Sequence, residues 1–302
     1  MSYNFQRQQN SSQTSRTYKF ILGFVIIPII FYLESARTKS FFNNYNWNSN
    51  IKALFSEAIF AVILTAICYF GCYLAKENPS SFLGLEANRK RYKFLLGLVI
   101  SGVLLLLTFI CDLTFGLIQF KDWGWQEKQL SGVVSDAFIE FLIVGIAAWI
   151  EELVVRGYIL QALEDCLNNC YFAIILSSTF FSYIHTSGHE PFWGILIGTS
   201  VIGVFLALGR YFTQSLWLSI GLHFGWNVFE GIIFGFKVSG NDDFLKCHFI
   251  CQDLTPLGGK REMFTGGEYG PEAGIIGGIA AILGCIALYF LSKRFGWSTR
   301  QL

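Results

Sequence analysis

Ionisable and amide side chains interrupt three apolar stretches near the middle of the chain. These stretches read W-I-E-E-L-V-V-R-G at 149–157, F-S-Y-I-H at 181–185 and G-L-H-F-G-W-N at 221–227. A charged or imidazole side chain at membrane depth costs free energy and therefore marks a candidate functional site. Three such clusters in three successive apolar stretches predict one shared pocket.

The first cluster holds two adjacent glutamates and an arginine. On a helix, Glu152 and Arg156 are four residues apart and share a face, so we expect an ion pair that holds the helix. Glu151 is rotated by about 100° and faces elsewhere. A buried carboxylate without a cationic partner tends to take up a proton, as a general acid or base must. We therefore assign Glu151 to chemistry, and Glu140, on nearly the same face, could extend a polar path towards water.

The other two clusters supply imidazole and amide groups. His223 and Asn227 are four residues apart, and Glu230 continues the same helical stripe. A histidine and an asparagine side by side can donate hydrogen bonds to one developing oxyanion. His185, brought beside Glu151, could orient a water molecule and help to deprotonate it. Each of these residues alone would more often be an interhelical hydrogen-bond partner. The combination favours a catalytic site.

Composition predicts the surroundings of this site. The chain has 302 residues, of which 53% are hydrophobic and 14% are charged. A soluble domain carries about 25% charged residues. The formal net charge of +1 leaves no basic footprint for nucleic acid. We expect an all-α, polytopic membrane helix bundle whose surroundings are the lipid bilayer, with no nucleic-acid partner.

Segment length sets the expected number of membrane spans. About 20 apolar residues cross a bilayer core, and this length gives eight candidate spans: 18–34, 56–75, 93–118, 134–160, 171–186, 193–209, 214–236 and 273–292. The basic cluster at 89–93 favours the cytoplasmic side for the segment between the second and third spans. The chain crosses the membrane twice before this segment and six times after it. Both termini are therefore expected in the cytoplasm.

We divide the chain into five parts: a polar tail at 1–16, membrane helices at 17–133, a catalytic core at 134–236, an extramembrane loop at 237–272, and a last helix with its tail at 273–302. The loop is rich in glycine and ends in G-G-E-Y-G-P-E-A-G. A loop of this length without obvious secondary structure is often a lid or a binding loop. Of the two C-x-x-x-C pairs, we expect free thiols at Cys166/Cys170, and a disulfide stays open for Cys247/Cys251.

The motifs support a family resemblance. E-E-x-x-x-R at 151–156, F-x-x-x-H at 181–185 and H-x-x-x-N at 223–227, in this order, resemble the three motifs of the CAAX protease and bacteriocin-processing family of intramembrane endopeptidases. The stretch S-L-W-L-S-I-G-L-H-F-G-W-N at 215–227 is similar to bacterial members, which implies a bacterial plasma membrane. The resemblance covers roughly 134–236.

The resemblance also implies roles and a substrate. Glu151 and His185 would activate the attacking water, and His223 and Asn227 would stabilise the oxyanion. Glu152 and Arg156 match the remaining motif positions and would support them. The substrate would be a peptide or protein, prenylated or unlipidated.

Family members have been called metalloproteases and glutamate proteases, so both chemistries are weighed. Zinc at a catalytic site usually takes three protein ligands, which Glu151, His185 and His223 could supply. A metal-free site uses the asparagine as well, and asparagine is a poor zinc ligand. We therefore favour a site without a metal or other cofactor, with one zinc ion as the alternative.

Two other functions fit the same residues. One is a catalytically silent immunity or scaffold protein that binds a peptide or a partner. The other is a proton-coupled carrier that uses Glu140, Glu151, Glu230 and the histidines as a relay. A carrier would more readily contain repeated halves with interrupted helices, and no convincing repeat is present.

Overall fold

The computed structural model describes residues 13–23, 49–86, 88–126, 129–186, 191–240, 249–254 and 261–297. Within these residues the chain is nearly all helical, as expected. The helices are α2 (Gln13–Ile21), α4 (Ser49–Leu74), α5 (Pro79–Phe82), α6 (Lys90–Thr114), α7 (Leu130–Glu152), α8 (Leu160–Leu167), α9 (Cys170–His185), α10 (Phe192–Thr213), α11 (Leu216–Asn227), α12 (Glu262–Thr265) and α13 (Ile275–Arg294).

Five helices among the described residues are long and apolar enough to cross a membrane: Ser49–Leu74, Lys90–Thr114, Leu130–Leu167, Phe192–Thr213 and Ile275–Arg294. Two of the eight expected spans contain α-helices shorter than the length that crosses a membrane. The span at 171–186 is the 16-residue helix α9, and the one at 214–236 is the 12-residue helix α11 followed by a π-helical segment. Most of the first expected span lies outside the described residues. The five long apolar helices therefore support an integral membrane protein, and they do not confirm a count of eight.

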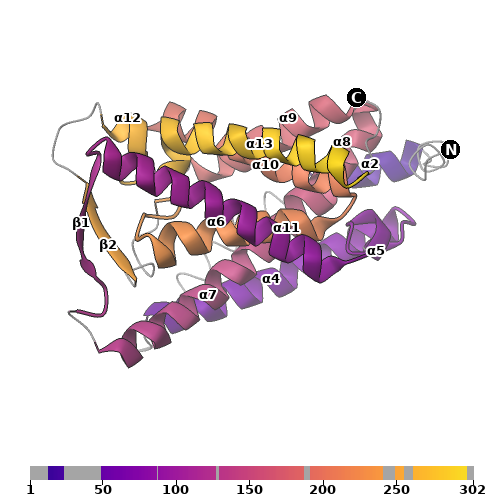
Figure 1. Cartoon of the computed structure of the whole chain (residues 1–302). Coiled ribbons are helices and arrows are strands. Elements are labelled where there is room, and N and C mark those ends of the chain that lie inside the picture. Colours follow the sequence, from indigo (N-terminus) through magenta and orange to yellow (C-terminus); the bar gives the residue numbers. More distant parts are fainter. Residues whose placement is uncertain are drawn as a thin grey trace.

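Helix α11 lies in the middle of the bundle, with α10 and α13 on one side and α4 and α7 on the other (Figure 1). Every residue of α11 except Trp217 is buried. Glycines allow α6 and α11 to approach closely, because a Cβ added at Gly221 would lie 2.1 Å from the carbonyl oxygen of Phe94. Ser101 of α6 donates a 2.6 Å hydrogen bond to the carbonyl of Leu222. This contact fixes the depth of α11 in the bundle.

Two π-helical segments prolong the helices of the core. The segment η2 (Leu153–Ile159) joins α7 to α8, and η3 (Val228–Ile233) follows α11. A π-helix adds a residue to the turn and is often found at functional sites. The first of them begins directly after Glu152, and the second directly after Asn227. Both motifs therefore lie where the helical repeat changes.

A short sheet closes one end of the bundle (Figure 1). Strand β1 (Ile118–Trp123) pairs antiparallel with β2 (Ile250–Leu254), and Ile118 lies opposite Leu254. The 237–272 segment, expected to lack obvious secondary structure, thus contains β2 and α12, and the 3₁₀ turn η4 (Pro271–Ala273) follows at its end. Pairing with a strand more than 100 residues away gives this segment a fixed place.

The cysteines follow the sequence interpretation as far as they are described. Cys166 and Cys170 are free thiols, as are Cys68, Cys72, Cys111 and Cys285. Cys251 takes part in a disulfide. Cys247 lies outside the described residues.

At the opposite end, α2 is held by a buried charge. The ammonium group of Lys19 is fully buried and lies 2.6 Å from a carboxylate oxygen of Glu77 and 2.6 Å from one of Asp165. Two anions around one buried cation satisfy most of its hydrogen-bonding capacity. This triad joins α2 to the end of α4 and to α8.

Candidate active site

Two capped helix starts place the histidines. The side chain of Asn169 accepts hydrogen bonds from the backbone N–H groups of Tyr171 and Phe172, so α9 begins at Cys170 and its last residue is His185. Ser215 caps α11 in the same way, with its side chain accepting from the N–H of Trp217. The end of α9 thus places His185 beside the end of α7 that carries the glutamates.

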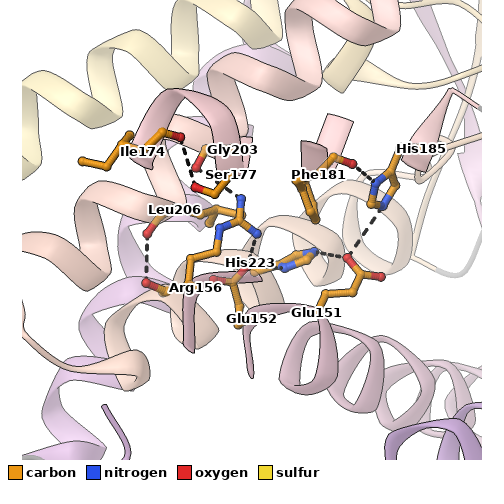
Figure 2. Close-up of polar contacts among 11 residues, drawn as sticks. Glu151, Glu152, Arg156, Ile174, Ser177, Phe181, His185, Gly203, Leu206 and His223 are labelled. Atoms are coloured by element: carbon orange, nitrogen blue, oxygen red, sulfur yellow. Dashed lines mark hydrogen bonds and ion pairs between the residues drawn. The ribbon is translucent and has the colours of Figure 1, made fainter. Parts of the chain in front are cut away.

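The three motifs meet at the carboxylate of Glu151 (Figure 2). Its Oε2 atom lies 3.6 Å from Nε2 of His185 and 3.8 Å from Nε2 of His223. The Glu151 side chain is 18% exposed, whereas that of Glu152 is fully buried. Two imidazoles from α9 and α11 therefore face one carboxylate oxygen from α7. The three residues lie together, as the sequence predicts.

The hydrogen bond of His185 defines its neutral tautomer. Its Nδ1 atom lies 2.7 Å from the carbonyl oxygen of Phe181, one helical turn earlier. A carbonyl oxygen only accepts hydrogen bonds, so Nδ1 carries the hydrogen. In the neutral ring, Nε2 then has a free lone pair and faces Glu151. His185 can accept a proton at this atom.

Glu152 has a larger part than the sequence suggested. Its Oε1 atom lies 2.7 Å from Nη1 of Arg156, which is the expected ion pair, and 3.0 Å from Nδ1 of His223. The side chains of Glu152 and Arg156 are both fully buried. Helical spacing predicts that Glu152 holds its own helix, and the structure shows that it also contacts the imidazole of His223. Spacing along one helix could not indicate a partner 71 residues away.

Arg156 links the site to α9 and α10. Its Nη2 group donates a 3.2 Å hydrogen bond to the carbonyl of Gly203. Its guanidinium lies 4.2 Å from the ring centroid of Phe181, in a cation–π contact. Phe181 therefore contributes both its ring and its carbonyl, a role that we did not predict. The i, i+4 spacing in F-x-x-x-H was the sequence signal for the contact between the Phe181 carbonyl and His185.

Asn227 and two further glutamates, Glu140 and Glu230, lie at varying distances from the Glu151 carboxylate. Asn227 is buried one turn beyond His223, and its side-chain oxygen has no hydrogen-bond partner among the described residues. Glu140 is fully buried, but eleven residues separate it from Glu151, or about 16 Å along the helix. Glu140 therefore does not belong to the site, and Glu230 lies in a neighbouring polar cluster. Within the described residues, no group of three or more histidine, cysteine or acidic side chains is arranged to hold a metal ion.

Fold and site together define a class: a membrane helix bundle with a carboxylate and two imidazoles gathered in its interior. Residues 134–229 match the family model described as Type II CAAX prenyl endopeptidase Rce1-like, and this stretch contains all six predicted site residues. Over this segment the match agrees with the family resemblance that the three motifs carry. No curated protein and no solved structure matches the chain.

Proposed function

We propose that the protein is an intramembrane endopeptidase that hydrolyses a peptide bond with a water molecule activated by Glu151 and His185. The observation that carries this proposal is the pair of imidazole Nε2 atoms facing one carboxylate oxygen. The match to an Rce1-like endopeptidase model supports peptide hydrolysis as the reaction.

The proposed first step is proton removal from the water. The Oε2 atom of Glu151 or Nε2 of His185 accepts the proton while the water oxygen attacks the scissile carbonyl carbon. The carbonyl double bond opens, and its electron pair becomes the oxyanion. The oxyanion electron pair then re-forms the carbonyl, the C–N bond breaks with its electron pair on the nitrogen, and the accepted proton passes to that nitrogen. General acid–base transfer of this kind typically contributes about 10²–10⁴-fold in rate.

The oxyanion would be stabilised by His223 and Asn227. Because Nδ1 of His223 lies against the Glu152 carboxylate, its Nε2 can donate to the oxyanion only if the ring is doubly protonated. The carboxylate of Glu152 favours that imidazolium form. The amide group of Asn227 would supply the second donor. Such donors are effective here because the apolar bundle excludes water.

We propose a metal-free site, because such a site uses Asn227, a poor zinc ligand, together with Glu151, His185 and His223. Chelators should therefore leave activity unchanged. Stoichiometric zinc whose removal abolishes cleavage and whose return restores it would reverse this part of the proposal.

The substrate class is proposed to be a peptide or protein segment that reaches the site from within the bilayer. A prenylated C-terminal peptide is the first candidate, because the matching family model is named for CAAX prenyl endopeptidases. A plain peptide of the same sequence is the comparison that decides whether the lipid is needed.

The test uses the purified full chain in lipid vesicles with farnesylated and plain peptides, and products are identified by mass spectrometry. Glu151→Gln and His185→Ala should abolish cleavage while the protein stays folded. Asp136→Asn changes a carboxylate on the same helix α7, about one turn before Glu140, and should retain activity. Asn227→Ala should lower kcat by about 10²–10³-fold, as loss of an oxyanion donor does. Full cleavage by the Glu151→Gln variant would end the proposal, and binding without cleavage by the unaltered protein would favour a silent binding protein.

A further inference from the structure

A second buried polar cluster lies beside the proposed catalytic residues. It consists of Glu230 from η3, Tyr269 and Glu272 from the segment before α13, Ser239, and Thr199 from α10. Both glutamates are almost completely buried, Glu230 at 0% and Glu272 at 5% exposure. The proposed mechanism uses none of these side chains. Burial of an unpaired charge costs free energy, so two buried glutamates in an apolar bundle indicate a specific structural or functional role.

A tight turn delivers Glu272 to this place. The backbone has positive φ angles at Gly266 (83°), Gly267 (58°) and Gly270 (115°), which other residues adopt only with strain. The N–H of Gly240 donates a 2.8 Å hydrogen bond to the carbonyl of Tyr269. These glycines come from the G-G-E-Y-G-P-E-A-G segment noted in the sequence. The motif is thus explained as the backbone conformation that presents Glu272.

Side-chain contacts hold the turn in place at both ends. Ser239 donates a 2.6 Å hydrogen bond to Oε2 of Glu272, and Lys237 forms an ion pair with the exposed Glu268. The turn also packs on α10, since a Cβ at Gly198 would lie 2.1 Å from the carbonyl oxygen of Glu272. There is no room for the turn to move towards α10. The Glu272 carboxyl group is therefore fixed relative to the bundle.

The carboxyl group of Glu272 interacts electrostatically with ionisable groups on several other elements. It lies within electrostatic reach of His185 on α9, His223 on α11 and Glu151 on α7. Tyr269 and Glu230 face it from its own turn and from η3. Burial raises the pKa of Glu272, while the Ser239 hydroxyl and the two imidazoles oppose this rise. Neither Glu230 nor Glu272 forms an ion pair with a lysine or arginine in the described part of the chain. Within the described part of the chain, the two histidines are thus the groups near Glu272 that can take up a positive charge.

We propose that Glu272 is a positioning residue of the active site, held by the Gly266–Glu272 turn so that its carboxyl group orients and stabilises the histidine pair. This inference rests on the proposed function, and it adds a fourth chain segment to a site that the three motifs define. When a histidine takes a proton during catalysis, a nearby carboxylate stabilises the imidazolium that forms. Glu272 contributes no atom to the bond that breaks.

The kinetic test compares Glu272→Gln with Glu268→Gln. Both variants remove one carboxylate from the same turn, but Glu268 is exposed and points to Lys237. We expect Glu272→Gln to lower kcat by about 10- to 100-fold, as loss of a group that orients catalytic residues typically does, with KM changed less than about twofold. Glu272→Asp should recover part of the loss, and Glu268→Gln should match the unaltered protein. A Glu272→Gln enzyme with unchanged kcat, or with a raised KM as its main defect, would overturn the proposal.

A second measurement does not depend on turnover. The chain has only four histidines, so ring-labelled histidine gives a simple NMR spectrum in detergent micelles. Glu272→Gln should shift the ring signals of His185 and His223, assigned by their alanine variants, and Glu268→Gln should not. Unmoved signals in a folded Glu272→Gln protein would refute the role even if its kinetics changed. Shifted signals in a protein that cleaves nothing would retain the positioning role and reject the proposed reaction instead.

Gly198→Ala displaces Glu272 without changing any ionisable group. The new methyl group would overlap the carbonyl of Glu272, so we expect a loss of kcat that resembles that of Glu272→Gln. Gly278→Ala is the matched control, because a Cβ there meets nothing within 4 Å. Equal kcat for the Gly198→Ala and Gly278→Ala proteins would count against the turn as the device that positions Glu272.

Discussion

Replacement of Glu152 by glutamine should separate the roles of two adjacent glutamates. Glu152 is fully buried between Arg156 at 2.7 Å and His223 at 3.0 Å. Glutamine keeps the size of the side chain and removes its charge. The guanidinium of Arg156 would then be a buried cation whose closest anion has gone. Glu151→Gln, in contrast, changes a partly exposed carboxylate whose Oε2 atom has no hydrogen-bond partner among the described residues.

The size of the effect follows from burial. Removal of one partner from a buried ion pair typically costs about 3–5 kcal/mol, because the other charge is left uncompensated. The hydrogen bond from Arg156 to Gly203 remains, which favours the lower end of this range. For a chain of this size, about 3 kcal/mol corresponds to a decrease in Tm of roughly 6–12 °C. Glu151→Gln should change Tm by less than about 2 °C.

The assay is thermal unfolding in detergent micelles, followed by tryptophan fluorescence at one fixed scan rate, with peptide cleavage measured on the same samples below the transition. We expect Glu152→Gln to lose both stability and activity, and Glu151→Gln to lose activity alone. Equal Tm values for the two variants would refute the division of roles. So would an inactive, fully stable Glu152→Gln protein, since its ion pair would then have no structural part.

Two further predictions concern packing and charge in the rest of the bundle. Gly221→Ala should destabilise the protein by about 1–3 kcal/mol, because its methyl group would overlap the backbone of Phe94. Gly145→Ala should be nearly neutral, since the nearest neighbour of its methyl group would be 3.4 Å away. Thermal unfolding of both variants checks this, and equal Tm values would contradict it. Lys19→Met should cost about 3–5 kcal/mol by leaving two carboxylates without their buried cation. Faster proteolysis within 13–23 in this variant would show α2 released, and unchanged protection would show that the triad does not hold it.

The sequence predicted the chemistry of the site better than its supports. Glu151, His185 and His223 were recognisable because each interrupts an apolar stretch, where an ionisable side chain is costly. The contact between Glu152 and His223 was not predictable, because helical spacing gives neighbours within one helix and says nothing of partners on another. The bounds of α9, in contrast, were predicted to within one residue at each end. Asn169, the residue that caps α9, lies in the short connection after α8 and was not recognised as a cap.

The arrangement outside the three motifs was harder to predict for physical reasons. Hydropathy reports length and apolar content, so it could not show that α11 ends at Asn227 and continues as a π-helix. The pairing of β1 with β2 joins segments more than 100 residues apart, and the register depends on contacts formed only in the folded chain. The glycine-rich segment was recognisable, but the position of its turn depends on contacts with Ser239 and Gly198 that form only in the folded chain.

The charges of the proposed site explain why two neighbouring glutamates are needed. Glu151 and Glu152 bring two negative charges, and Arg156 brings one positive charge, so the group carries a net charge of −1 when His223 is neutral. A net charge in an apolar bundle is costly, and a proton on His223 cancels it. The imidazolium then has Glu152 at Nδ1 and Glu151 at Nε2. Donation to an oxyanion requires this same protonated form, and the oxyanion would form on the Nε2 side. Glu152 thus stabilises the imidazolium form of His223, and the positive charge of this ring balances the negative charge of Glu151 in the proposed reaction.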